Sequence, residues 1–299
     1  MSTLQRRAFI GRRPVYTHSE RAAIARETAM TMLKDPNVHL SSPEIQARVD
    51  SVHASLVKPL GKELGIRRPT PGIAVIEGGE GAHGASALPN GSIVVHRQVV
   101  DLADRIGAAI ASSRDEKEMI GNLKDVARGR FVAPAHLDRT RAQEYAKATV
   151  AFVIGHEMTH GVRQDGATGQ APIRKGMWGR AKRAAETASD AGGLELATRA
   201  GYSPMGQVGW SLYQMVETAV HGRDLDAKQQ GSHPTPLARY TFAYRYLDNR
   251  KDTSRITNEG GSRQAGEPFF SAAQKSAFAS IPSPEAVRKQ LKELDRKTP

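Results

Sequence analysis

The stretch from Ala148 to His160, ATVAFVIGHEMTH, decides the fold. It is the second half of a segment from Arg141 to Val162 with helical composition, and it is apolar nearly all round a helix. A helix of that kind is buried in the core of a protein. Because buried polar groups are unfavourable without partners, the ionisable residues at its end need hydrogen-bond partners or a metal ion.

The end of this helix carries the motif His156-Glu157-Met158-Thr159-His160. The two histidines are four residues apart, so they share one helix face and both imidazoles can reach one metal ion. Glu157 is rotated by one position and can touch a metal-bound water without binding the metal. This is the geometry of a general base that acts on zinc-activated water, and the motif predicts one Zn²⁺ per chain.

Zinc hydrolysis needs a third protein ligand and an open fourth position. The best candidate is Glu186, which lies on a second predicted helix from Gly179 to Gly201. Asp190 follows it by four residues and shares its helix face. We expect Glu186 to bind the metal and Asp190 to reach the free ring nitrogen of a ligating histidine, which fixes the tautomer of that histidine.

The composition limits the other classes of site. The chain has 299 residues, of which 39% are apolar and 25% charged, a globular composition that can build a core. It has no cysteine, which excludes disulfides, a thiol nucleophile and thiolate metal sites, so a metal must bind to histidine and carboxylate. No apolar run approaches the ~18–20 residues of a membrane-spanning helix.

The chain is strongly basic, with 43 Lys and Arg against 31 Asp and Glu. This charge favours an anionic surface or an acidic partner, and no nucleic-acid-binding motif accompanies it. Residues 1–18 are rich in arginine and are predicted to be a disordered basic arm. No apolar signal region follows, so we expect a cytoplasmic protein by default, with export by a signal-independent route as the alternative.

The pattern along the chain predicts a mainly helical α+β fold with a small sheet in its first half. Strands are expected at 72–77 and 92–96, joined by a glycine-rich stretch. The polar segment 112–139 is expected to be a surface loop, either a lid that covers the active-site cleft or a passive insertion. Residues 250–268 are expected to form a linker, followed by a C-terminal helical tail over 269–299 that Phe269 and Phe270 anchor to the domain. The other helices are expected at 19–34, 43–64, 98–111, 203–221 and 234–249.

Between Gly72 and Asp248 the chain resembles the M48 zinc metallopeptidases, which include the heat-shock protease HtpX, the CAAX prenyl endopeptidases and soluble periplasmic members. The motifs that carry the resemblance are HEMTH (156–160), ETASD (186–190), AGYSP (200–204) and SHPTPLAR (232–239), with GASALP (84–89) upstream.

The resemblance implies an M48-like peptidase domain over residues 19–249 with a zincin-like (gluzincin) fold and protein or peptide substrates. It implies that His156, His160 and Glu186 bind zinc and that Glu157 is the base. Three further roles are implied. Asp190 supports the ligands, His233 donates to the oxyanion of the tetrahedral intermediate, and Arg239 supports the site. The substrate would lie extended along the strand that includes Ser86, Ala87 and Leu88.

Two alternatives remain open. The spacing of 26 residues from His160 to Glu186, and the Glu-x-x-x-Asp frame, also fit a thermolysin-like peptidase with the same ligands. A catalytically silent, metal-stabilised binding or chaperone-like protein could keep the same site. The presence of Glu157 argues against the second alternative, because a structural site needs no base and closes its fourth position.

Overall fold

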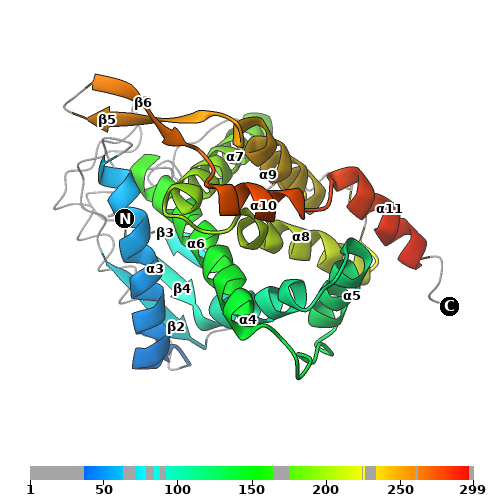
Figure 1. Ribbon diagram of the computed structural model, residues 1–299. Helices are drawn as coiled ribbons and strands as arrows, with labels where there is room; N and C mark the ends of the chain where they lie inside the picture. The colour runs from blue at the N-terminus through cyan, green and yellow to red at the C-terminus, as the bar shows by residue number, and fades with distance from the viewer. Residues whose placement is uncertain are drawn as a thin grey trace.

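A computed structural model describes residues 37–62, 72–78, 84–87, 92–163, 175–223, 225, 234–259 and 262–295 (Figure 1). Within them, helices predominate and a small mixed sheet stands beside them, which confirms the α+β prediction. The expected basic arm and the expected helix at 19–34 lie outside the described residues.

Helix α6 (Arg139–Arg163) is the centre of the fold, as its apolar sequence predicts (Figure 1). Phe152, Ile154 and Met158 of this helix are at most 1% exposed. Four helices pack against it: α3 (Pro43–Lys62), α4 (Arg97–Ala111), α7 (Lys175–Arg199) and α8 (Pro204–Val220). Helix α6 therefore has helical neighbours on several sides.

Glycines let two of these helices approach α6 very closely. A methyl group added at Gly193 of α7 would lie 2.9 Å from both the main-chain nitrogen of His156 and the carbonyl oxygen of Phe152. Real Cβ atoms do not approach backbone atoms this closely, so only glycine fits at this crossing. A methyl group at Gly206 of α8 would likewise meet the main chain of Tyr145. The two glycines bring α7 and α8 into backbone contact with the helix that carries the histidines.

The sheet has the strand order β1 (His39–Leu40), β2 (Ile73–Glu77), β4 (Ile93–His96) and β3 (Ala85–Ala87). Strands β2 and β4 are parallel, and β1 and β3 are antiparallel to their neighbours. The predicted strands at 72–77 and 92–96 are confirmed as β2 and β4. The residue pattern alone predicts a connection in the glycine-rich stretch between them, whereas the M48 resemblance implies a strand there; the stretch contains the edge strand β3.

The polar segment 112–139 is not the surface loop and lid that we expected. It contains helix α5 (Glu116–Ala127), whose N-cap Asp115 accepts a hydrogen bond from the main-chain N–H of Glu118. Helix α5 packs against α4 and α8. The side chains that it buries there are Met119, Ile120, Leu123 and Val126. The helical spacing of these apolar residues lets the segment form a buried helix despite its polar composition.

The expected linker at 250–268 also differs from the structure. After helix α9 (Pro236–Arg250), the chain forms an antiparallel hairpin of β5 (Ser254–Glu259) and β6 (Ser262–Pro268). The Gly260-Gly261 pair between the two strands is a sequence signal for such a hairpin.

The predicted anchor of the C-terminal residues is confirmed. Phe269 and Phe270 are each 1% exposed and belong to the main hydrophobic core. Helices α10 (Ala272–Ala279) and α11 (Pro284–Asp295) follow them. Helix α10 packs against α8, and α11 packs against α5 and α9. The C-terminal helices therefore complete the same core that surrounds α6.

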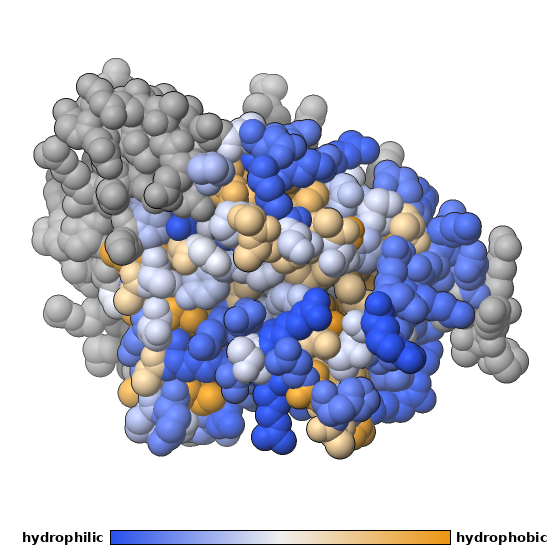
Figure 2. All heavy atoms as spheres, viewed as in Figure 1, coloured by the Kyte–Doolittle hydropathy of each residue, from blue (hydrophilic) through white to orange (hydrophobic). Residues whose placement is uncertain are grey.

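On the face drawn in Figure 2, apolar residues lie in small, separate patches among hydrophilic ones. Among the described residues, we find no helix with the length and apolar character needed to cross a membrane.

Candidate metal centre

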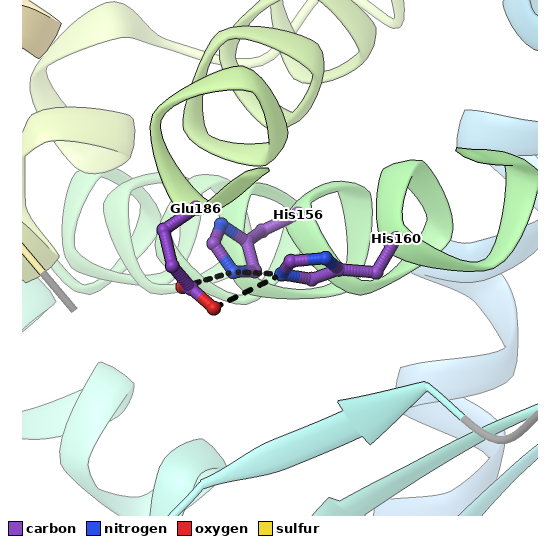
Figure 3. A group of neighbouring side chains, drawn as sticks. All are labelled: His156, His160 and Glu186. Atoms are coloured by element: carbon purple, nitrogen blue, oxygen red, sulfur yellow. Dashed lines mark hydrogen bonds and ion pairs between the residues drawn. The ribbon is translucent and has the colours of Figure 1, made fainter. Parts of the chain in front are cut away.

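Three ligand-type side chains converge where α6 and α7 cross. His156 and His160 project from α6 toward Glu186 of α7 (Figure 3). The two Nε2 atoms are 3.1 Å apart, and the carboxylate oxygens of Glu186 lie 3.4 Å from His156 Nε2 and 3.5 Å from His160 Nε2. The three groups can hold a metal ion. Three electron-pair donors this close repel one another unless a proton or a cation lies between them.

Asp190 orients one of these ligands. Its Oδ1 lies 2.8 Å from Nδ1 of His156, and the carboxylate is 2% exposed. A carboxylate at this nitrogen keeps the ring proton on Nδ1, so the lone pair of Nε2 points to the cluster. Burial alone raises the pKa of Asp190, but the hydrogen bonds and charges of His156 and Arg239 outweigh it and the pKa is lowered. Asp190 is therefore an anion at neutral pH, as this role requires.

Arg239 of α9 holds Asp190 from the other side. Its Nε donates to Oδ2 over 3.0 Å and a terminal nitrogen donates to Oδ1 over 2.5 Å. Both side chains are nearly inaccessible, so this is a buried, bidentate ion pair. Arg239 contacts the site through Asp190: the guanidinium positions the carboxylate that positions His156.

Glu157 lies beside the cluster and does not belong to the ligand set. Its Oε2 accepts a 2.8 Å hydrogen bond from the main-chain N–H of Ala87 in β3. Burial raises the pKa of Glu157, and the neighbouring histidines and the Ala87 bond offset that rise in part. A carboxylate with a raised pKa is a stronger proton acceptor, which suits a general base.

Strand β3 presents its outer edge to this glutamate. The main-chain N–H of His96 donates to the carbonyl oxygen of Gly84 over 3.0 Å, so Gly84 faces β4. The hydrogen-bonding direction alternates along a strand, so Ala85 and Ala87 face the open edge and Ser86 faces β4. Of the expected substrate strand, Ser86 and Ala87 are therefore part of β3. Leu88 lies outside the described residues.

The centre opens into a cleft of about 410 Å³. His156, Glu157, Glu186 and Arg239 line it, together with Gly84 and Ala85 of the sheet edge. The rest of its lining includes Phe152 and Val153 of α6 and a set of α8 residues: Trp210, Gln214, Glu217 and Thr218. The metal centre is thus reachable from a space large enough for a short stretch of peptide.

The sequence pattern found most of this site. The structure brings the predicted residues His156, Glu157, His160, Glu186, Asp190 and Arg239 together. His233 lies outside the described residues, and its expected role stays a prediction. The α8 lining was missed, although the spacing of its four residues along one helix is visible in the sequence.

Comparisons of the chain with protein-family models, with curated proteins and with solved structures give no match. The chemistry of the site must therefore be argued from its own side chains.

Proposed function

We propose that this chain is a zinc-dependent endopeptidase with a zincin-like catalytic domain. The observation that carries the proposal is the size of the ligand triangle. Zinc binds imidazole nitrogen and carboxylate oxygen at about 2.0–2.2 Å, so tetrahedral coordination places ligand atoms roughly 3.3–3.5 Å apart. The two Nε2 atoms are 3.1 Å apart, and each lies 3.4–3.5 Å from one of the two carboxylate oxygens of Glu186, so the separations are close to those that zinc requires.

The types of ligand agree with this choice of metal. Two neutral imidazoles and one carboxylate are a ligand set used by catalytic zinc, with the fourth position left for water or substrate. The cleft that His156 and Glu186 line leaves that position accessible. When bound, zinc would polarise the scissile carbonyl and lower the pKa of a water molecule to near neutrality.

The protein's own residues supply the proton transfers. Glu157 takes a proton from the attacking water and passes it to the leaving amine. Its raised pKa suits both steps, since the group must bind the proton and release it again. The hydrogen bond from Ala87 holds the carboxylate toward the cleft and leaves its other oxygen for the water. His233 is proposed to donate to the oxyanion, as the M48 resemblance implies.

The open edge of β3 is proposed to bind the substrate backbone. The main-chain groups of Ala85 and the carbonyl of Ala87 face outward there, so an extended peptide can add as a further strand. The same hydrogen bond that fixes Glu157 comes from Ala87. A peptide bound along this edge is therefore held beside the base and the metal ligands together.

The Glu157→Gln variant tests the proposal. Glutamine keeps the shape of the side chain and still accepts the Ala87 hydrogen bond, but it cannot take a proton. We expect wild type and variant to bind one zinc each, measured by elemental analysis, and the variant to cleave a denatured protein mixture about 10²–10⁴-fold more slowly.

A matched control is Glu144→Gln, which makes the same change at an exposed position of the same helix. It should retain wild-type cleavage. Equal cleavage by wild type and Glu157→Gln would overturn the proposed mechanism. Zinc binding without any cleavage by wild type would favour the catalytically silent, metal-stabilised protein instead.

A further inference from the structure

One wall of the cleft takes no part in metal binding. Trp210, Gln214, Glu217 and Thr218 line the cleft from α8, and we call these four residues the α8 wall. Their spacing of four, three and one places them on one side of the helix. They all follow Gly206, the point where α8 meets α6. The α8 wall therefore faces the same space as the metal ligands but offers different chemistry.

The polar groups of the α8 wall are mainly hydrogen-bond acceptors. The side-chain oxygen of Gln214 is buried and has no hydrogen-bond partner among the described residues. One carboxylate oxygen of Glu217 accepts a 3.1 Å hydrogen bond from the hydroxyl of Tyr213. The hydroxyl of Thr218 donates to the main-chain oxygen of Gln214 over 2.7 Å. The accessible acceptor of the wall is the carboxylate of Glu217, which favours a ligand that brings N–H groups.

The same part of the cleft is also partly apolar. Trp210 of the α8 wall and the side chains of Phe152 and Val153 of α6 line it. A side chain that places an alkyl stem on these residues and N–H groups at its tip would match both features. Lysine and arginine have this form, and their cations also interact favourably with the face of an indole ring.

The charges in the cleft agree with a basic ligand. Arg239 is already neutralised by its ion pair with Asp190. Arg223, the other arginine that the described residues place in the lining, is exposed to solvent, which screens its charge. Glu217 is only half-buried but faces the cleft, so its negative charge acts on a bound side chain.

We propose that the α8 wall selects peptide substrates that carry lysine or arginine beside the scissile bond. This inference rests on the proposed peptidase function and adds the substrate class to it. Glu217 is the specificity-determining residue, because its charge distinguishes a cation from an uncharged side chain of equal length. Trp210 contacts the stem, and Gln214 lies beside it on the same side of α8.

The first measurement is the cleavage preference of the wild-type protein. Peptides would differ only in whether lysine, arginine, norleucine or glutamate occupies each position around the bond that is cut. We expect kcat/KM to be about 10–100-fold higher for lysine or arginine than for norleucine at one position, as for a hydrogen bond to a charged group. No preference, or a preference for glutamate at every position, would overturn the proposal.

The second measurement is the ratio of kcat/KM for the lysine peptide to that for the norleucine peptide in variants. This ratio should fall about tenfold in Glu217→Gln. In Glu217→Lys, kcat/KM for the glutamate peptide should exceed that for the lysine peptide. The ratio should keep its wild-type value in Glu144→Gln. A general loss of structure changes both rates together and leaves the ratio unchanged, so an unchanged ratio in both Glu217 variants would refute the role of this residue.

The third measurement separates this inference from the proposed function. Binding of the lysine and norleucine peptides to zinc-loaded Glu157→Gln protein can be followed by fluorescence anisotropy, which requires no hydrolysis. Tighter binding of the lysine peptide that disappears in the Glu157→Gln, Glu217→Gln double variant supports the α8 wall even if wild type cleaves nothing. Equal binding of the two peptides overturns the α8 wall even if wild type is an active peptidase.

Discussion

Replacement of Gly193 by alanine should weaken metal binding without changing any ligand. The new methyl carbon would lie 2.9 Å from two backbone atoms of α6, at His156 and Phe152, whereas ordinary contacts begin at 3.4 Å. Backbone atoms cannot rotate away, so α7 must move by roughly 0.5 Å, the gap between these distances. Glu186 lies two turns away on the same helix and would move with it. Metal ligands must lie within about 0.2 Å of their required positions.

Two quantities should therefore change in Gly193→Ala. The free energy of unfolding of the metal-free protein, measured by urea denaturation, should fall by about 1–3 kcal/mol, as overpacked cores do. The Kd for zinc, measured by competition with a chromophoric chelator, should rise at least about tenfold because the carboxylate no longer meets both imidazoles at the right distances.

The matched control is Gly121→Ala in α5. A methyl group there meets no atom within 4 Å. This variant should gain about 0.5–1 kcal/mol in stability, as alanine does in a helix, and should keep the wild-type Kd for zinc. The reasoning fails if Gly193→Ala binds zinc as tightly as wild type, since that would mean that the spacing of α6 and α7 does not set the ligand geometry.

Three further predictions concern the surroundings of the ligands. Asp190→Asn should weaken zinc binding about 10–100-fold and lower the free energy of unfolding by about 3–5 kcal/mol, because Arg239 is left buried without its carboxylate. Adding Arg239→Met should recover most of that stability but not the zinc affinity; equal urea midpoints for the single and double variants would contradict this. Ala87→Pro should keep one zinc per chain but cleave about tenfold more slowly, because proline has no N–H for Glu157; an unchanged rate would show that this bond is dispensable. Removal of zinc by a chelator should lower the melting temperature of wild type, because zinc at 100 times its Kd stabilises the folded state by about 2.7 kcal/mol. The melting temperature of His156→Ala should stay nearly unchanged.

The sequence predicted those parts of the site that depend on spacing within one helix. His156, Glu157 and His160 lie on one helix, as do Glu186 and Asp190, so a period of 3.6 residues was enough to place them. That the two helices would meet was predicted only from the chemistry of their side chains. What allows them to meet, the glycine at position 193, had no distinguishing pattern in the sequence.

Other parts could not be read from local patterns for different reasons. Strand β3 is Ala-Ser-Ala, which has no strand propensity of its own, and it is defined by pairing with β4 and by the bond to Glu157. The spacing of the apolar residues in α5 indicates a helix, but the prediction of a loop gave more weight to the polar composition of the segment. The α8 wall depends on which side of a buried helix faces the cleft, and this is decided by tertiary packing.

The burial of Phe269 and Phe270 determines when this protein can first assemble during its synthesis. A ribosome delivers the chain from the N-terminus, and domains generally fold as units. The core around α6 includes these two phenylalanines and residues of α11, so it stays incomplete until α11 has emerged. Asp190 likewise gains its ion-pair partner only when Arg239 of α9 has been synthesised, nearly fifty residues later. A nascent chain that carries both histidines but not yet Arg239 therefore lacks the ion pair that holds Asp190 against His156.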